Sequence, residues 1–180
     1  MIGVVEPGAR AAVAATRGGP LGVIGTSGTI ASGAYERAIA ALAPSTTIVT
    51  AACPLFVPLV EEGWLDTEPT RLIAREYLRP LAAARVDTLV LGCTHYPLLK
   101  PLLAEEMRRA GDPTVQLIDS AEETAADTAS TLRARGLEKR GGSPAYRFIA
   151  SDAPEHFLRA SRRFLGENGV IESVEEVRLG

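Results

Sequence analysis

Cysteine and histidine are scarce in this sequence, and their scarcity limits the chemistry available to the chain. The 180 residues include two cysteines, Cys53 and Cys93, and two histidines, His95 and His156. Two cysteines are too few for a disulfide framework and are typical of a protein in a reducing cytoplasm. The cysteines and histidines do not follow a metal-ligand spacing, so we expect no metal site.

Strong net charge and long apolar runs are also missing. The formal net charge is −3, so the chain has neither the basic footprint of a nucleic-acid-binding protein nor a strongly acidic field. No apolar run approaches the length of a membrane-spanning helix, and the first residues lack the features of a signal peptide. We therefore expect a cytoplasmic protein without membrane or direct nucleic-acid partners.

What is present is a hydrophobic fraction of 46%, which can bury the core of one domain, or of one domain and part of another. Alternating apolar and amphipathic stretches predict strands at 2–5, 21–25, 46–52, 86–91, 115–118 and 146–150, with a further candidate in 170–180. They predict helices at 7–16, 26–43, 69–84, 97–110, 120–135 and 154–165. Ser120 and Glu123 suggest a capping box. This alternation is typical of a three-layer αβα sandwich with a mainly parallel sheet.

The stretch 86–99, VDTLVLGCTHYPLL, carries the densest chemistry of the chain. An apolar strand ends at Gly92, and Cys93, Thr94 and His95 follow consecutively. Ligands bind outside the carboxyl ends of strands in open α/β sheets, so these side chains are expected to face a pocket. A helix N-terminus and an imidazole can lower the pKa of the Cys93 thiol and make it a nucleophile or base. The alternative is a small buried side chain, the commoner role of a free cysteine.

Two further segments carry candidate site residues. Residues 25–29, GTSGT, turn a strand into a helix, where Thr26 and Thr29 either bind an anion or simply cap the helix. Glu61 follows an apolar stretch that would hold a carboxylate near apolar surface, although Glu62 beside it is an open alternative. Cys53 has no hydroxyl or imidazole neighbour in the sequence, so we expect it to be structural.

Four blocks of the sequence resemble the glutamate racemase family. GCTHYPLL at 92–99 is similar to the C-terminal signature of that family. VVEPGARAA at 4–12, GVIGTSGTIASGAYERAI at 22–39 and ACPLFVPLVEEG at 52–63 resemble other blocks of the family in the same order. The resemblance implies a cofactor-independent enzyme that interconverts L- and D-glutamate and supplies D-glutamate for bacterial peptidoglycan.

The resemblance also implies roles for the candidate residues. Racemisation by two bases places a thiolate on one face of glutamate and a thiol on the other, and Cys93 would serve one face. His95 would tune Cys93 and contact substrate, Thr94 would hold a substrate carboxylate or amine, and Glu61 would support His95. Thr26 and Thr29 would lie on the substrate side of their loop.

Part of the family pattern is absent from this sequence. Relatives carry an N-terminal lobe with an Asp-Ser pair and a first catalytic cysteine in a Cys-Asn-Thr motif, and neither motif occurs in the corresponding context here. The resemblance therefore predicts that 7–117 form the second racemase lobe, whereas 1–6 and 118–180 pack with the absent one. We expect exposed apolar surface, oligomerisation or a complementing N-terminal lobe, and reduced or no activity of the chain alone.

Two other functions remain open at this stage. An aspartate-type amino-acid racemase would share the fold and the thiols, although the residues after Cys93 and Thr94 favour glutamate. A non-catalytic binding module is the second alternative, because some glutamate racemases restrain DNA gyrase.

Overall fold

The computed structural model describes residues 2–110, 114–139, 141–143, 145–166, 171 and 173–177. The chain divides into two compact units, Met1–Glu138 and Lys139–Gly180. No helix among the described residues is long and apolar enough to cross a membrane.

A parallel sheet forms the centre of the first unit. Its strands are β1 (Leu21–Gly25), β2 (Ile48–Ala52), β3 (Thr88–Leu91) and β4 (Gln116–Asp119), in the order β2-β1-β3-β4. The central strands β1 and β3 are buried along their whole length, as expected for strands covered on both faces. Since all four run parallel, the carboxyl ends of β1, β3 and β4 meet at one edge of the sheet.

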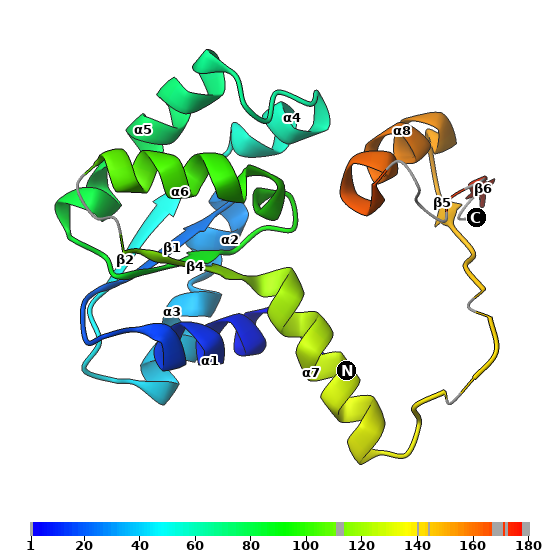
Figure 1. The fold of residues 1–180 in the computed structure, drawn as a ribbon, viewed down its shortest axis with the longest axis horizontal. Helices are drawn as coiled ribbons and strands as arrows, with labels where there is room; N and C mark the ends of the chain where they lie inside the picture. Colours follow the sequence, from blue (N-terminus) through cyan, green and yellow to red (C-terminus); the bar gives the residue numbers. More distant parts are fainter. Residues whose placement is uncertain are drawn as a thin grey trace. The chain divides into compact units, whose positions relative to one another are not determined.

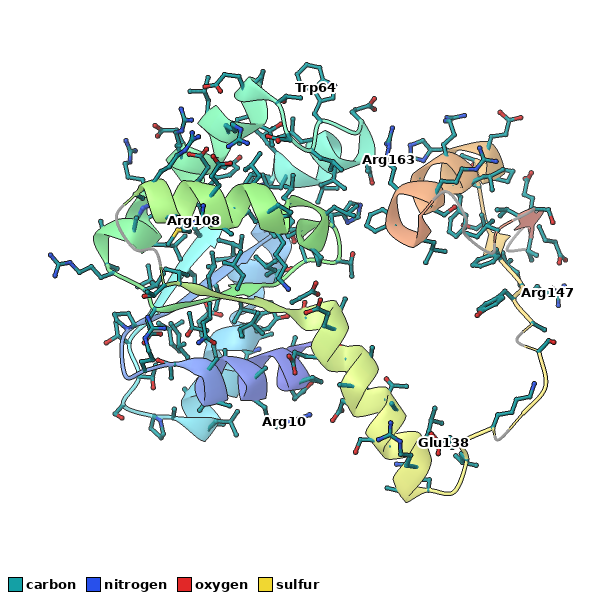
Figure 2. The ribbon with its side chains drawn as sticks, in the orientation of Figure 1. Arg10, Trp64, Arg108, Glu138, Arg147 and Arg163 are labelled. Atoms are coloured by element: carbon teal, nitrogen blue, oxygen red, sulfur yellow. The ribbon has the colours of Figure 1, made fainter. Side chains whose placement is uncertain are left out.

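Helices cover both faces of this sheet, which confirms the predicted three-layer sandwich (Figure 1). One face carries α1 (Val5–Ala15) and α3 (Ala34–Leu42), and the other carries α4 (Phe56–Glu61), α5 (Glu68–Ala83) and α6 (Lys100–Arg109). Three shorter or peripheral helices complete the unit: α2 (Ser27–Ser32), the 3₁₀ helix η1 (Tyr96–Leu99) and α7 (Ser120–Ala134). Arg10 of α1, labelled in Figure 2, pairs with Asp127 of α7 at 2.7 Å.

Three local predictions for this unit are wrong. Residues 2–5 form no strand, because Val5 already opens α1. The helix expected at 26–43 is divided into α2 and α3 at Gly33, whose φ of 60° ends the first helix in the left-handed conformation. Asp119, rather than Ser120, caps α7 by accepting hydrogen bonds from the backbone amides of Ala121 and Glu122.

The second unit is a small βαβ element. Its two-stranded parallel sheet consists of β5 (Ile149–Ala150) and β6 (Glu175–Glu176), with α8 (Pro154–Leu165) between them in sequence. Arg147, labelled in Figure 2, pairs with Glu175 at 2.6 Å. The strand expected at 146–150 is shorter than predicted, and 170, 172 and 178–180 of the expected tail lie outside the described residues.

Candidate active site

The loop after β3 carries three consecutive chemical groups, and its backbone is fixed on both sides. The amide of Gly92 donates to the carbonyl of Ile24 at 2.8 Å, which extends the pairing of β3 with β1 by one residue. The amide of Tyr96 then donates to the carbonyl of Cys93 at 3.1 Å and closes the turn. Glycine is required at 92, because a Cβ there would lie 2.8 Å from the carbonyl oxygen of Ile24 and 3.0 Å from the Tyr35 ring.

Cys93, His95 and Glu61 form a continuous chain of polar contacts. The Sγ of Cys93 lies 3.9 Å from Nδ1 of His95, and Nε2 of His95 lies 3.2 Å from Oε1 of Glu61. With the Glu61 carboxylate as acceptor, Nε2 carries a proton and Nδ1 presents its lone pair toward the thiol. The arrangement can therefore take a proton from Cys93 and stabilise the resulting imidazolium and thiolate.

Thr94 lies beside the same ring. Its Oγ1 is 3.4 Å from Nδ1 of His95, and its side chain is exposed at the mouth of the site. It is free to turn its hydroxyl toward a bound polar group. The carboxylate of Glu61 contacts His95. The choice of Glu61 over Glu62 as the site residue stays a prediction.

Burial controls the acidity of the candidate thiol. Desolvation raises the pKa of Cys93, whereas hydrogen bonds from the backbone amides of His95 and Tyr96 oppose that shift. The expectation of a lowered pKa is therefore wrong for this chain, because the half-buried sulfur loses more hydration than two amides restore. Cys93 rests as a thiol and needs a partner to remove its proton.

A cavity of about 770 Å³ lies next to the thiol. Its floor contains Gly92, Cys93 and Thr94 from the end of β3, and Thr29 from α2. One face of α7 contributes small and apolar side chains to its wall: Ala121, Thr124, Ala125, Thr128, Ala129 and Leu132. The parallel sheet explains this convergence, because these segments all follow strand ends at the same edge.

Thr26 and Thr29 hold the loop that follows β1. The hydroxyl of Thr26 accepts a hydrogen bond from the amide of Thr29 at 3.2 Å, so Thr26 is the N-cap of α2. The two hydroxyls are 2.9 Å apart. Thr29 lines the cavity, whereas Thr26 contacts Thr29 without lining the cavity itself. One residue of this pair therefore caps α2, and the other lines the cavity.

Two residues of this site escaped the sequence analysis. Tyr35 of α3 is 2% exposed and lines the cavity. Burial raises the pKa of its phenol, and the neighbouring Ser120 side chain partly opposes that shift. The hydroxyl of Ser120 donates to the carbonyl of Leu91 at 2.7 Å. No local pattern signals this pair, because the contact depends on how α3 and α7 meet the end of β3.

The other cysteine belongs to the core of the first unit, and the other histidine belongs to the second unit. Cys53 is fully buried in the core beneath α4 and α5, and burial raises its pKa to about 12. This surrounding supports the predicted structural role. His156 belongs to α8 in the second unit. Among the described residues, no group of three or more acidic, histidine or cysteine side chains forms a metal-binding cluster.

Comparisons with known proteins agree on one family. A glutamate racemase of Geobacter metallireducens is 51% identical over 99% of this chain and 64% of its own length. A solved glutamate racemase isoform from Bacillus anthracis superposes with a TM-score of 0.89 at 38% identity, covering 99% of this chain and 64% of that one. Glutamate racemase from Francisella tularensis, solved in complex with D-glutamate, gives a TM-score of 0.86 at 31% identity, covering 98% of this chain and 63% of that one.

The chain thus spans slightly under two thirds of the length of these relatives. The family profile described as Asp/Glu/Hydantoin racemase matches residues 1–128. That range includes all four strands of the first sheet and the loop that bears Cys93. This chain is therefore a member of the Asp/Glu/Hydantoin racemase family.

Proposed function

We propose that this chain provides one half of the active site of a cofactor-independent glutamate racemase. The observation that carries the proposal is the contact chain from Cys93 through His95 to Glu61 beside the 770 Å³ cavity. The names of the relatives specify glutamate as the amino acid. In a bacterial cell, the product D-glutamate would enter peptidoglycan synthesis.

In the proposed mechanism each residue of the site has one role. The Cys93 thiolate would take the α-proton of bound glutamate and become a thiol, leaving a carbanion next to the carboxylate. In the reverse direction the Cys93 thiol would return a proton to the same face. His95, held by Glu61, would accept the proton of the Cys93 thiol and so generate the thiolate, which the raised pKa of Cys93 otherwise disfavours. Thr94 and Thr29 would hold the charged ends of the substrate.

Inversion of the α-carbon requires a second acid on the opposite face of the substrate. The described part of the chain brings one thiol, Cys93, to the cavity, because Cys53 is enclosed in the core. We therefore assign the second acid/base group to a complementing lobe. In this proposal 7–117 form the second racemase lobe, and 1–6 and 118–180 pack with the complementing one, whereas the first compact unit of the structure extends from Met1 to Glu138.

The second unit, Lys139–Gly180, supports the assignment of that part of the chain to the complementing lobe. Two strands of two residues each do not form a stable sheet by themselves, and both faces of a parallel sheet are normally covered. Large apolar side chains are nevertheless exposed there: Tyr146, Ile149, Phe157, Phe164, Leu165 and Val177. A partner lobe would cover them. Both cysteines are free thiols, which supports the proposed cytoplasmic location.

Solvent deuterium exchange at the α-carbon tests the proposal. The chain is incubated in D₂O with L- or D-glutamate, alone and with the remaining segment of a relative added as a separate polypeptide, and exchange is followed by NMR. We expect exchange that depends on Cys93 and disappears in Cys93→Ser, whereas Cys53→Ser retains it. The same assay with aspartate tests the alternative that the site acts on aspartate. Equal exchange in Cys93→Ser, or none even with the added segment, would refute the proposal.

A further inference from the structure

Tyr96 is enclosed between the candidate site and the core. It follows His95 directly, and its side chain is fully buried. The phenol donates to the backbone carbonyl of Cys53 at 2.9 Å. The ring meets that of Phe56 edge to face, with centroids 5.3 Å apart and an interplanar angle of 89°. The residue is therefore fixed by two contacts, both to the segment that follows β2.

These contacts join the two parts of the chain that meet at the His95–Glu61 pair. Phe56 opens α4, and Glu61 closes the same helix one and a half turns later. His95 is adjacent to Tyr96. The side chains of His95 and Glu61 are themselves 22% and 37% exposed, and a polar contact open to solvent does little to fix the distance between its own partners. The distance must be set by something more rigid, and the buried contacts of Tyr96 are suited to that.

We infer that Tyr96 is a positioning residue, which fixes the distance between His95 and Glu61 and thereby the reactivity of the Cys93 thiol. The inference rests on the proposed function, in which His95 assists Cys93. It assigns to Tyr96 no contact with substrate. It also gives Cys53 a role through its backbone carbonyl, which is independent of the Cys53 thiol.

Removal of the phenol oxygen alone should leave the fold intact. In Tyr96→Phe the ring keeps its place against Phe56. The carbonyl of Cys53 is not left unpaired, because it also accepts a hydrogen bond from the amide of Phe56 at 3.1 Å. The matched control is Tyr77→Phe, since Tyr77 also meets the Phe56 ring edge to face, with centroids 5.2 Å apart, and its phenol accepts a 3.4 Å hydrogen bond from the amide of Leu55.

The experiment measures the alkylation rate of Cys93 by iodoacetamide from about pH 6 to about pH 9, with mass spectrometry to assign the modified residue. The proteins are the full chain, Tyr96→Phe, Glu61→Gln, the double variant and Tyr77→Phe. We expect each of the first two substitutions to slow alkylation near neutral pH by about three-fold or more. The double variant should be no slower than the slower single variant, and Tyr77→Phe should match the unmodified sequence.

Non-additivity is the result that a purely structural role would not give. If Tyr96 acts through Glu61 and His95, its substitution has nothing left to disturb once Glu61 is replaced. Multiplying effects in the double variant, an unchanged rate in Tyr96→Phe or Glu61→Gln, or equal slowing by Tyr77→Phe would each overturn the inference. The assay contains no glutamate, so a chain that fails to exchange α-deuterium yet shows this pattern would refute the proposed function and retain the positioning role.

Discussion

The two thiols of this chain differ because of what surrounds them, and the difference predicts their reactivity. Cys53 is fully buried with a pKa raised to about 12, whereas Cys93 borders a cavity and its pKa is raised less. At about pH 8 iodoacetamide should therefore modify Cys93 and leave Cys53 unmodified. Alkylation of Cys93 should accelerate as the pH rises, because only the thiolate reacts. Peptide mass spectrometry reports both sites.

Denaturant provides the control for this labelling, since both thiols should then react at similar rates. Modification of Cys53 in the folded chain at a rate like that of Cys93 would contradict the prediction. It would mean that the core beneath α4 and α5 opens readily.

Gly92 has no room for a side chain. A Cβ at 92 would press on the Ile24 carbonyl and the Tyr35 ring, and a backbone carbonyl cannot move aside cheaply. Gly92→Ala should lower the free energy of unfolding by about 1–3 kcal/mol and reduce the alkylation rate of Cys93. Thermal or urea unfolding measures the first effect.

Gly28→Ala is the matched control for Gly92. No atom lies within 4 Å of a Cβ at 28, which is inside α2, so this substitution should be neutral or stabilise the chain by up to about 1 kcal/mol. Equal destabilisation by both substitutions would show that close packing at 92 is not the cause.

The sequence allowed the polar residues of the β3 loop to be predicted because their arrangement is local. Cys93, Thr94 and His95 follow a buried strand, and a strand end in a parallel sheet faces a pocket wherever the strand lies. Tyr35 and Ser120 could not be found in this way. Their contact joins helices 85 residues apart in the chain, and it exists only after α3 and α7 have packed against the same strand end.

At the scale of elements, prediction succeeded where the pattern was long or sharply bounded. The bounds of β1 and α8 agree with the ranges 21–25 and 154–165. It failed at 2–5, because an apolar run of four residues does not distinguish a strand from the first turn of a helix. It also failed at Gly33, where the division of one amphipathic stretch depends on a single backbone angle.

Asp87 ties the start of the central strand to the loop between α1 and β1. Its carboxylate accepts hydrogen bonds from the backbone amides of Arg17 at 2.8 Å and Gly19 at 2.9 Å, and from the hydroxyl of Thr16 at 2.9 Å. Asp87→Ala removes the acceptor of both amides, while the Thr16 hydroxyl keeps the carbonyl of Gly19 at 3.3 Å, and the substitution should lower the free energy of unfolding by about 3 kcal/mol. The exposed pair of Arg10 with Asp127 is the control, and Asp127→Ala should cost no more than about 1 kcal/mol.

The same carboxylate predicts a pH dependence. Burial favours the protonated form of Asp87, but the amides of Gly19 and Arg17 and the hydroxyl of Thr16 outweigh it, so the pKa lies below its usual 3.8. The stabilisation is therefore complete above that value and is lost as the pH falls through the lower pKa of the folded chain. The difference in stability between the full chain and Asp87→Ala should shrink in acid. A difference that stays constant would contradict this origin.

At the scale of the whole molecule, the division into two units predicts where the chain can be cut. The described residues between α7 and β5 are exposed and have no regular secondary structure, whereas unit 1 has a continuous core on both faces of its sheet. Limited trypsin digestion should cleave after Lys139 before it cleaves within 2–110. Mass spectrometry identifies the fragments. Early cleavage inside the sheet would contradict the division.

The second unit predicts how the chain behaves in solution. A βαβ element with a two-stranded sheet buries too little apolar surface to offset the cost of ordering its residues, and α8 exposes Phe157, Phe164 and Leu165. We expect the chain to self-associate and to bind a hydrophobic dye, as measured by light scattering and fluorescence. Adding the complementing lobe should reduce both signals, because the lobe would cover that face. A compact monomer that binds no dye would show that the second unit is stable alone, and would remove the main reason for assigning 139–180 to a lobe shared with another segment.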